Sequence, residues 1–302
     1  MKTIHKKLDF KAKYNYMKIE TSGLSRDKDQ IISIGILEKN SDNIINYTIE
    51  SLKEEKDLID SIISVAQHKE FITLSGNTFD LPFLNEKSRF YSGKNIDVNL
   101  IDTQKIIKKY NYLFNLESYS IKNLLLYFNI CKKEDLVDGI KNHIYFKNFI
   151  EGKSDNFDKI SENNIINITY LIKLYDAIKS EIENKLSFSI LNYNFCIKDI
   201  NLNMNTLEVI GKSNYEYKYF NTNKFYTLDL SNEFNLKINT MDLPYDEDNK
   251  CYLVMKKDYG NIINRSKIKS PNKILILYYK NYIYENILEI TKFILNKEIN
   301  NM

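Results

Sequence analysis

The sequence is poor in several residue types. It contains no tryptophan, three prolines, eight glycines and three cysteines among its 302 residues. The cysteines, Cys131, Cys196 and Cys251, lie far apart and form no CxxC pair, which argues against both a zinc motif and a disulfide framework. No window approaches the roughly 18 consecutive apolar residues of a membrane-spanning helix. No apolar run follows the basic N-terminal residues as it would in a signal peptide. We therefore expect a cytoplasmic protein without membrane contact.

The charge balance does not indicate a function. The 43 Lys and Arg residues nearly offset the 40 Asp and Glu residues, which leaves a net charge of +3. A surplus this small does not by itself indicate nucleic-acid binding, so any such binding must come from local placement of charges. The length is sufficient for one large domain or two modest ones.

The first half of the chain reads as a mixed α/β domain. Short strands are expected at residues 14–20, 30–38 and 44–50, followed by an amphipathic helix from residue 51. A fourth strand at residues 71–75 would then run parallel to the first, and a fifth is expected at 96–102. The pattern predicts a mixed five-stranded sheet flanked by helices.

The segment from Tyr14 to Lys39 carries the first chemical signal. Glu20 ends a buried strand, and Gly23 lies in the turn directly beyond it. A carboxylate at the end of a buried strand, before a glycine turn, is typical of the first acids in a metal-dependent nuclease. The segment resembles the opening motif of DEDD-type 3′–5′ exonucleases, in particular the YprB-like ribonuclease H-like family. Five residues keep the family pattern: Ile19, Glu20, Thr21, Gly23 and Leu24. The family's first aspartate is replaced by Lys18.

A second segment, Gly76–Leu84, is similar to the second motif of the same family. It matches at Gly76, Phe79, Asp80, Pro82, Phe83 and Leu84. Taken alone, Asp80 would more often be the N-cap of a helix. Its pairing with the Glu20 motif upstream favours a site residue instead. The stretch Asp135–Gly139 also follows the family pattern, and the resemblance extends over roughly residues 10 to 180.

The third acidic motif falls in a long helix expected between Phe157 and Lys185. Asn164 and Leu171 match the family, but the metal-binding aspartate is replaced by Asn167 and the preceding histidine by Asn163. Asp176 lies nine residues beyond Asn167. That spacing is about 14 Å along a helix, too far for a substitute ligand.

The resemblance implies a site of four metal-binding positions, which here are Lys18, Glu20, Asp80 and Asn167. Members of the family hold two divalent ions, Mg²⁺ or Mn²⁺, with four carboxylates. Two carboxylates remain in this chain, and the formal charge of the cluster rises from about −4 to about −1. Only Glu20 and Asp80 remain to hold Mg²⁺ or Mn²⁺, and the site is also compatible with no metal at all. The implied substrate contacts are Thr21, Gly23, Asn77, Phe79 and Asn164.

Beyond residue 185 the pattern changes to short alternating apolar and polar runs, with a final helix. We expect a ribonuclease H-like domain at residues 1–185 and a β-rich accessory domain, closed by a helix, at residues 186–302. No catalytic motif lies in the second domain.

Three functions stay open at this point. The favoured one is a protein that binds single-stranded nucleic acid through a 3′–5′ exonuclease-like domain with impaired catalysis. The first alternative is an active exonuclease with an altered one-metal site. The second is a non-catalytic scaffold that contacts only proteins.

Overall fold

The computed structural model describes residues 1–114, 116–136, 139–153 and 156–301. Val137 and Asp138, within the Asp135–Gly139 stretch, lie outside the described residues. The chain divides into two compact units. Unit 1 contains residues 1–109 and 116–179, and unit 2 contains residues 110–115 and 180–302. The domain boundary near residue 185 stays a prediction.

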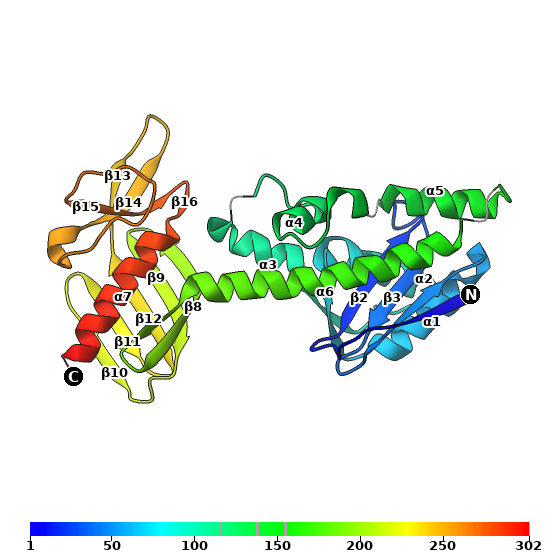
Figure 1. The fold of residues 1–302 in the computed structure, drawn as a ribbon, viewed down its shortest axis with the longest axis horizontal. Helices are drawn as coiled ribbons and strands as arrows, with labels where there is room; N and C mark the ends of the chain where they lie inside the picture. The colour runs from blue at the N-terminus through cyan, green and yellow to red at the C-terminus, as the bar shows by residue number, and fades with distance from the viewer. Residues whose placement is uncertain (115, 137–138, 154–155, 302) are drawn as a thin grey trace. The chain divides into compact units, whose positions relative to one another are not determined.

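Unit 1 is built on a six-stranded sheet with the strand order β1-β4-β3-β2-β5-β6 (Figure 1). Its strands are β1 (Lys2–Lys7), β2 (Tyr16–Thr21), β3 (Ile31–Leu37), β4 (Asn43–Thr48), β5 (Lys69–Thr73) and β6 (Val98–Asp102). Strand β1 pairs with β4, β4 with β3 and β3 with β2, all antiparallel, and β5 and β6 continue the sheet in parallel with β2. The predicted mixed α/β class is confirmed, with one strand more than expected. The additional strand, β1, is a lysine-rich edge strand.

The helices of unit 1 cover both faces of this sheet. They are α1 (Glu55–Ala66), α2 (Leu81–Ser92), α3 (Thr103–Lys109), α4 (Ile121–Tyr127), α5 (Gly139–Ile150) and most of α6 (Asp158–Leu186), with short helices η1 (Leu52–Glu54), η2 (Gly76–Asp80) and η4 (Lys133–Asp135). Among the described residues, no helix has both the length and the apolar composition needed to cross a membrane.

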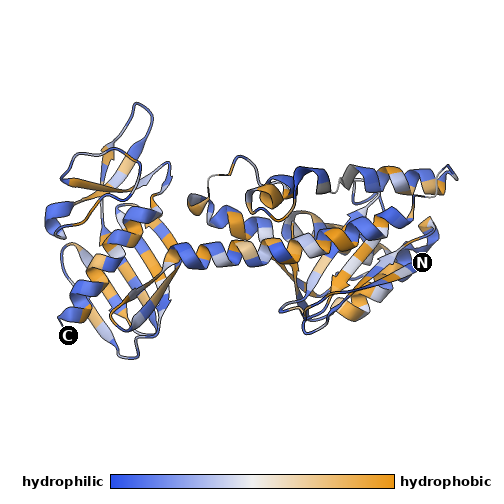
Figure 2. Ribbon diagram, viewed as in Figure 1, coloured by the Kyte–Doolittle hydropathy of each residue, from blue (hydrophilic) through white to orange (hydrophobic). Residues whose placement is uncertain are grey.

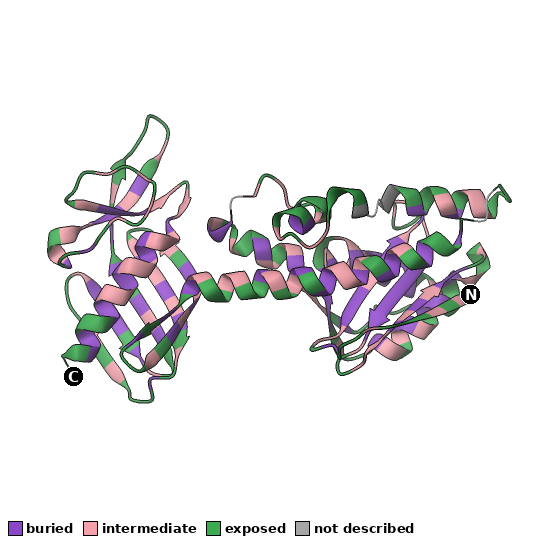
Figure 3. Cartoon of the chain, viewed as in Figure 1, coloured by how far each residue is buried: buried purple, intermediate pink, exposed green. Residues whose placement is uncertain are grey.

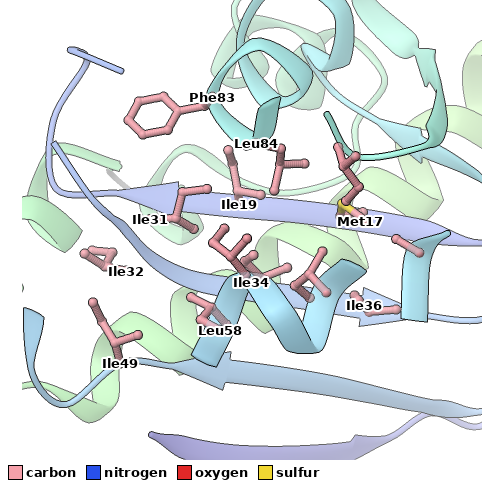
Figure 4. Close-up of a cluster of buried hydrophobic side chains, with 14 of the residues drawn as sticks. Met17, Ile19, Ile31, Ile32, Ile34, Ile36, Ile49, Leu58, Phe83 and Leu84 are labelled. Carbon is pink, nitrogen blue, oxygen red and sulfur yellow. The ribbon is translucent and has the colours of Figure 1, made fainter. Parts of the chain in front are cut away.

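Two apolar clusters hold these layers together. The first joins α1 and α2 to one face of the sheet, where Met17 and Ile19 of β2 lie (Figure 4). The second joins α6 to the opposite face, where Tyr16 packs against Ile168 and Leu171. Side chains alternate along a strand, so Lys18 and Glu20 fall on the same face as Tyr16. The strand register therefore directs both side chains toward α6.

A buried polar cluster joins α6 to β3 and β4. It consists of Ser33, Asn46, Thr48, Ser161 and Asn164, each with 0% of its surface exposed. Thr48 Oγ1 lies 2.7 Å from Ser161 Oγ and donates to Ser33 Oγ at 3.0 Å. Asn164 Nδ2 donates to Ser33 Oγ at 3.1 Å. Because hydrogen bonds are directional, this cluster fixes the position of α6 along its axis and its rotation about that axis.

Gly35 allows α6 to approach the sheet closely. It lies on β3 opposite Lys18. A Cβ atom at this position would lie 2.3 Å from Ile168 Cδ1, far inside van der Waals contact. Ile168 is fully buried, so its side chain has little room to move away.

Unit 2 contains two antiparallel sheets and a helix. The larger sheet has the order β10-β11-β12-β9-β8-β7, and the smaller one has the order β13-β14-β15-β16. The elements are β7 (Ser187–Ile190), β8 (Tyr193–Asn203), β9 (Thr206–Ser213), β10 (Tyr219–Thr222), β11 (Tyr226–Leu230), β12 (Glu233–Asn239), β13 (Met241–Pro244), β14 (Lys250–Met255), β15 (Ile274–Tyr279), β16 (Asn281–Tyr282), α7 (Tyr284–Asn300), η3 (Asn111–Leu113) and η5 (Lys256–Asp258). The β-rich region with a terminal helix is confirmed. The apolar and polar bands that alternate along β8 to β12 are visible in Figure 2.

Helix α7 lies across the larger sheet of unit 2 and turns its apolar side toward it (Figures 1 and 3). At its end, Glu298 is 3% exposed and accepts hydrogen bonds from the Tyr219 hydroxyl, from Asn221 Nδ2 at 2.8 Å and from the Tyr226 hydroxyl at 2.5 Å. Burial alone would raise the pKa of Glu298, but these donors lower it below its ordinary value of 4.5. The carboxylate thus attaches the helix to β10 and β11.

We expect Glu298→Gln to destabilise unit 2 by about 1–3 kcal/mol at pH 7, because at least one buried donor loses its acceptor. A lowered pKa in the folded state stabilises the fold above the unfolded-state pKa, and this stabilisation is lost as the pH falls through the folded-state value. The difference between variant and wild type should therefore shrink below about pH 4.5. Urea titrations across pH would measure it, with Glu247→Gln on an exposed turn as the matched control. An equal loss in both variants would contradict this role.

We expect Gly35→Ala to destabilise unit 1 by about 1–3 kcal/mol, because the new methyl group collides with Ile168. Adding Ile168→Val, which removes Cδ1, should recover part of that loss. A double-mutant cycle measured by denaturant unfolding gives the coupling, with Ile168→Val alone as the control. If the two substitutions are simply additive, the close approach of α6 is not the reason for the glycine.

Candidate active site

Lys18 and Glu20 form the centre of the candidate site. The Lys18 ammonium lies 3.6 Å from Glu20 Oε1 and donates to the carbonyl oxygen of Ile19 at 2.6 Å. The side chains are 19% and 9% exposed. Desolvation opposes the charge on Lys18, but Glu20 and Asp80 outweigh it and raise the pKa of Lys18 above its ordinary value of 10.5. Lys18 is therefore a permanent cation between two acids.

Helix α6 supplies two asparagines to the same place. Asn167 Nδ2 donates to Glu20 Oε1 at 3.1 Å, the same oxygen that Lys18 approaches. Asn164 Nδ2 donates to the carbonyl oxygen of Lys18 at 3.3 Å. The two asparagines are three residues apart, which places them on one side of the helix. The amide of Asn167 thus offers Glu20 a hydrogen, where a carboxylate would offer a metal an oxygen.

The other residues of the third motif lie away from this centre. Asn163 Nδ2 donates to Asn142 Oδ1 of α5 at 2.6 Å. Asp176 is exposed and lines a pocket near Tyr16, at the opposite end of β2 from Glu20. Neither side chain takes up the role of the replaced aspartate.

Asp80 completes the group of charges. It is the last residue of η2, occupies the N-cap position of α2 and is 2% exposed. Among the residues that the structure describes, its side chain makes no capping hydrogen bond, and Oδ2 has no hydrogen-bond partner. The interpretation of Asp80 as a simple helix cap is therefore wrong. Burial raises its pKa from 3.8 to about 6, with Lys18 lowering it and Glu20 and Asp102 raising it. The pKa of Asp80 thus depends on burial and on three charged neighbours.

Asp102 is a member of this group that the sequence analysis did not select. It ends β6 and is 5% exposed. Its Oδ2 accepts the backbone N–H of Asn77 at 3.0 Å, and its Oδ1 accepts the N–H of Lys105 at 3.0 Å. The sequence signal that could have identified Asp102 is its position at the end of β6, because the carboxyl ends of parallel strands lie at one edge of a sheet. Asp102 holds the loop that carries Asp80.

The implied substrate contacts have visible structural roles. Thr21 Oγ1 donates to the carbonyl oxygen of Gly23 at 2.6 Å. A Cβ at Gly23 would lie 2.3 Å from Asp29 Oδ2, so the glycine makes room for that carboxylate. Phe79 packs on Phe83 with ring centroids 5.5 Å apart, while Asn77 is exposed. Contact of these residues with a substrate stays a prediction.

The donor set does not fit a two-metal centre. In the part of the chain that the structure describes, no group of three or more His, Cys, Asp or Glu side chains is arranged to hold a metal ion. Glu20 already accepts a hydrogen bond from Asn167 and forms an ion pair with Lys18. Hard divalent ions need several oxygen ligands. The residues present are arranged as an ion pair between Lys18 and Glu20.

Comparison with known proteins identifies the family. A family model of the RNase H superfamily matches residues 15–179, more than half of the 302 residues. A search of curated proteins gives no match. The matched segment contains Lys18, Glu20, Asp80 and Asn167 and coincides largely with unit 1. The chain therefore belongs to the RNase H superfamily, with a ribonuclease H-like domain of nuclease type at residues 15–179.

Proposed function

We propose that the ribonuclease H-like domain binds single-stranded nucleic acid as a 3′–5′ exonuclease does, but does not hydrolyse it. The observation that carries this proposal is the Lys18 ammonium 3.6 Å from Glu20 Oε1. A cation at about 4 Å from a divalent ion opposes metal binding by several kcal/mol, even at an effective dielectric constant near 20. The two-metal route to phosphodiester cleavage is thereby blocked.

Substrate binding is supported by groups around the same edge of the sheet. Lys18 is partly exposed, and an ammonium is a suitable partner for a backbone phosphate. Leu24 is 84% exposed in the turn after Glu20, where it offers an apolar surface to a base. Arg26 is exposed in the same turn and contacts the carbonyl oxygen of Thr78 at 3.4 Å, which brings its guanidinium beside the η2 loop. The turn that follows Glu20 thus carries an apolar group and a cation, both suited to contact with a single strand.

We expect the wild type to leave end-labelled single-stranded DNA and RNA intact in Mg²⁺ or Mn²⁺. Lys18→Asp combined with Asn167→Asp should produce shortened strands, because the four carboxylates are then restored on an unchanged scaffold. Glu20→Ala in this double variant is the matched control and should abolish the products. Wild-type cleavage that Glu20→Ala removes would instead establish an active enzyme with an altered metal site.

Binding is measured separately by fluorescence polarisation with labelled single strands. We expect saturable binding by the wild type, with an affinity that falls as salt rises, because phosphate contacts release counterions. Arg26→Gln should weaken this binding, whereas Lys94→Gln on an exposed loop should not. Absence of binding at low salt would leave only the scaffold interpretation.

The ionisation of Asp80 gives an independent test of the electrostatic coupling between Lys18 and Asp80. A folded-state pKa of about 6 is above the ordinary 3.8, so the fold loses stability as the pH rises through this range. The shift corresponds to at most about 3 kcal/mol. In Asp80→Asn this dependence should disappear, and denaturant unfolding between pH 4 and 8 would detect it. Lys18→Met should move the dependence to higher pH. An unchanged profile in both variants would contradict the coupling of Lys18 to Asp80.

A further inference from the structure

A second pocket of unit 1 lies at the opposite end of β2 from Glu20. It has a volume of about 330 Å³ and is lined by Phe10, Lys11, Lys13, Tyr16, Ile172, Lys173 and Asp176. Tyr16 and Glu20 are four residues apart, or roughly 13 Å along a strand. The pocket is therefore separate from the candidate active site. Its size is within the usual range for small-molecule sites.

The polar groups of this pocket are mainly cations. Lys11, Lys13 and Lys173 are exposed, and within the described residues none of them forms an ion pair. With Asp176 as the single acid, the lining carries a formal charge of +2. Three ammonium groups without anionic partners, gathered around one concave surface, favour a ligand with a phosphate group.

The remaining lining is apolar and aromatic. Tyr16 and Ile172 are 1% and 4% exposed and form the floor. Phe10 is 42% exposed, so its ring is accessible to a ligand. An aromatic ring beside ammonium groups suits a planar base attached to a phosphate.

The loop that carries Phe10 and two of the lysines is held at several points. The N–H of Ala12 donates to the carbonyl oxygen of Ser41 at 2.8 Å, and the carbonyl oxygen of Ala12 accepts the N–H of Asn40 at 2.8 Å. Asn15 donates to the carbonyl oxygen of Glu70 and accepts from the N–H of Lys39, each at 2.8 Å. Lys11 and Lys13 flank the anchored Ala12. The cations are thus presented by ordered backbone, which lowers the entropy cost of binding.

From this arrangement we propose that the pocket binds a nucleoside phosphate unit. The lysines bind the phosphate, and Phe10 stacks on the base. Asp176, an acceptor-only group, receives hydrogen bonds from the ribose hydroxyls, so a ribonucleotide is preferred over a deoxyribonucleotide. The unit is either a free nucleotide or one residue of a single strand, because both present the same groups.

The test is isothermal titration of the full chain with adenosine 5′-monophosphate and, separately, with an eight-residue oligoadenylate. We expect Lys11→Gln, Lys13→Gln and Lys173→Gln together to weaken binding at least tenfold. A triple variant with the same charge change at exposed positions, Lys53→Gln, Lys56→Gln and Lys94→Gln, should bind as the wild type does. Binding of the mononucleotide identifies a free nucleotide as a ligand, and binding of the oligomer alone identifies a strand.

Two further variants test the parts of the pocket. Phe10→Ala should weaken binding of the nucleotide, and Asp176→Asn should reduce the preference for adenosine over deoxyadenosine monophosphate. The proposal is overturned if both triple variants bind alike, if neither probe binds, or if inorganic phosphate binds as tightly as the nucleotide. Lys18→Asp with Asn167→Asp should leave binding of adenosine 5′-monophosphate unchanged, which separates this result from the fate of the proposed function.

Discussion

The ion pair between Lys18 and Glu20 is the interaction on which the site depends. A carboxylate at the buried end of a strand needs compensation for its lost hydration. In metal-dependent nucleases divalent ions provide that compensation, whereas here an ammonium and the amide of Asn167 do so. The strand end, the turn after it and the facing helix can therefore keep their arrangement without an ion. This arrangement is the basis of our proposal that metal-dependent hydrolysis is lost.

The position of α6 is the second constraint. The helix approaches β3 at Gly35, where no side chain intervenes, and its asparagines reach Lys18 and Glu20 from there. Asp80 lies on a different element, the η2 loop, whose backbone donates a hydrogen bond to Asp102. The site is thus assembled by three separate elements of the sheet and its covering helix. Its geometry follows from packing that lies outside the site itself.

The sequence predicted the central elements because their signals are local. Apolar runs and glycine turns were sufficient for β2, β3 and α6, whereas the role of the four site positions, which came from the family resemblance, stays a prediction. Strand β1 was not anticipated, because its residues are mostly polar and exposed and its stability comes from pairing with β4, a contact distant in sequence. Asp102 was missed as a site member for a related reason. Its neighbour Asp80 is close only after the parallel strands have assembled. The unpartnered state of Asp80 likewise depends on burial, which no local pattern reveals.

The buried polar cluster behind the site has a consequence for how this protein can change over time. Apolar cores tolerate many substitutions of similar volume. A hydrogen-bonded network of Ser33, Asn46, Thr48, Ser161 and Asn164 does not, because losing one member leaves another buried polar group unsatisfied. Such a network resists gradual drift and preserves the register of α6. The architecture of the site is thus held by residues other than Lys18, Glu20, Asp80 and Asn167.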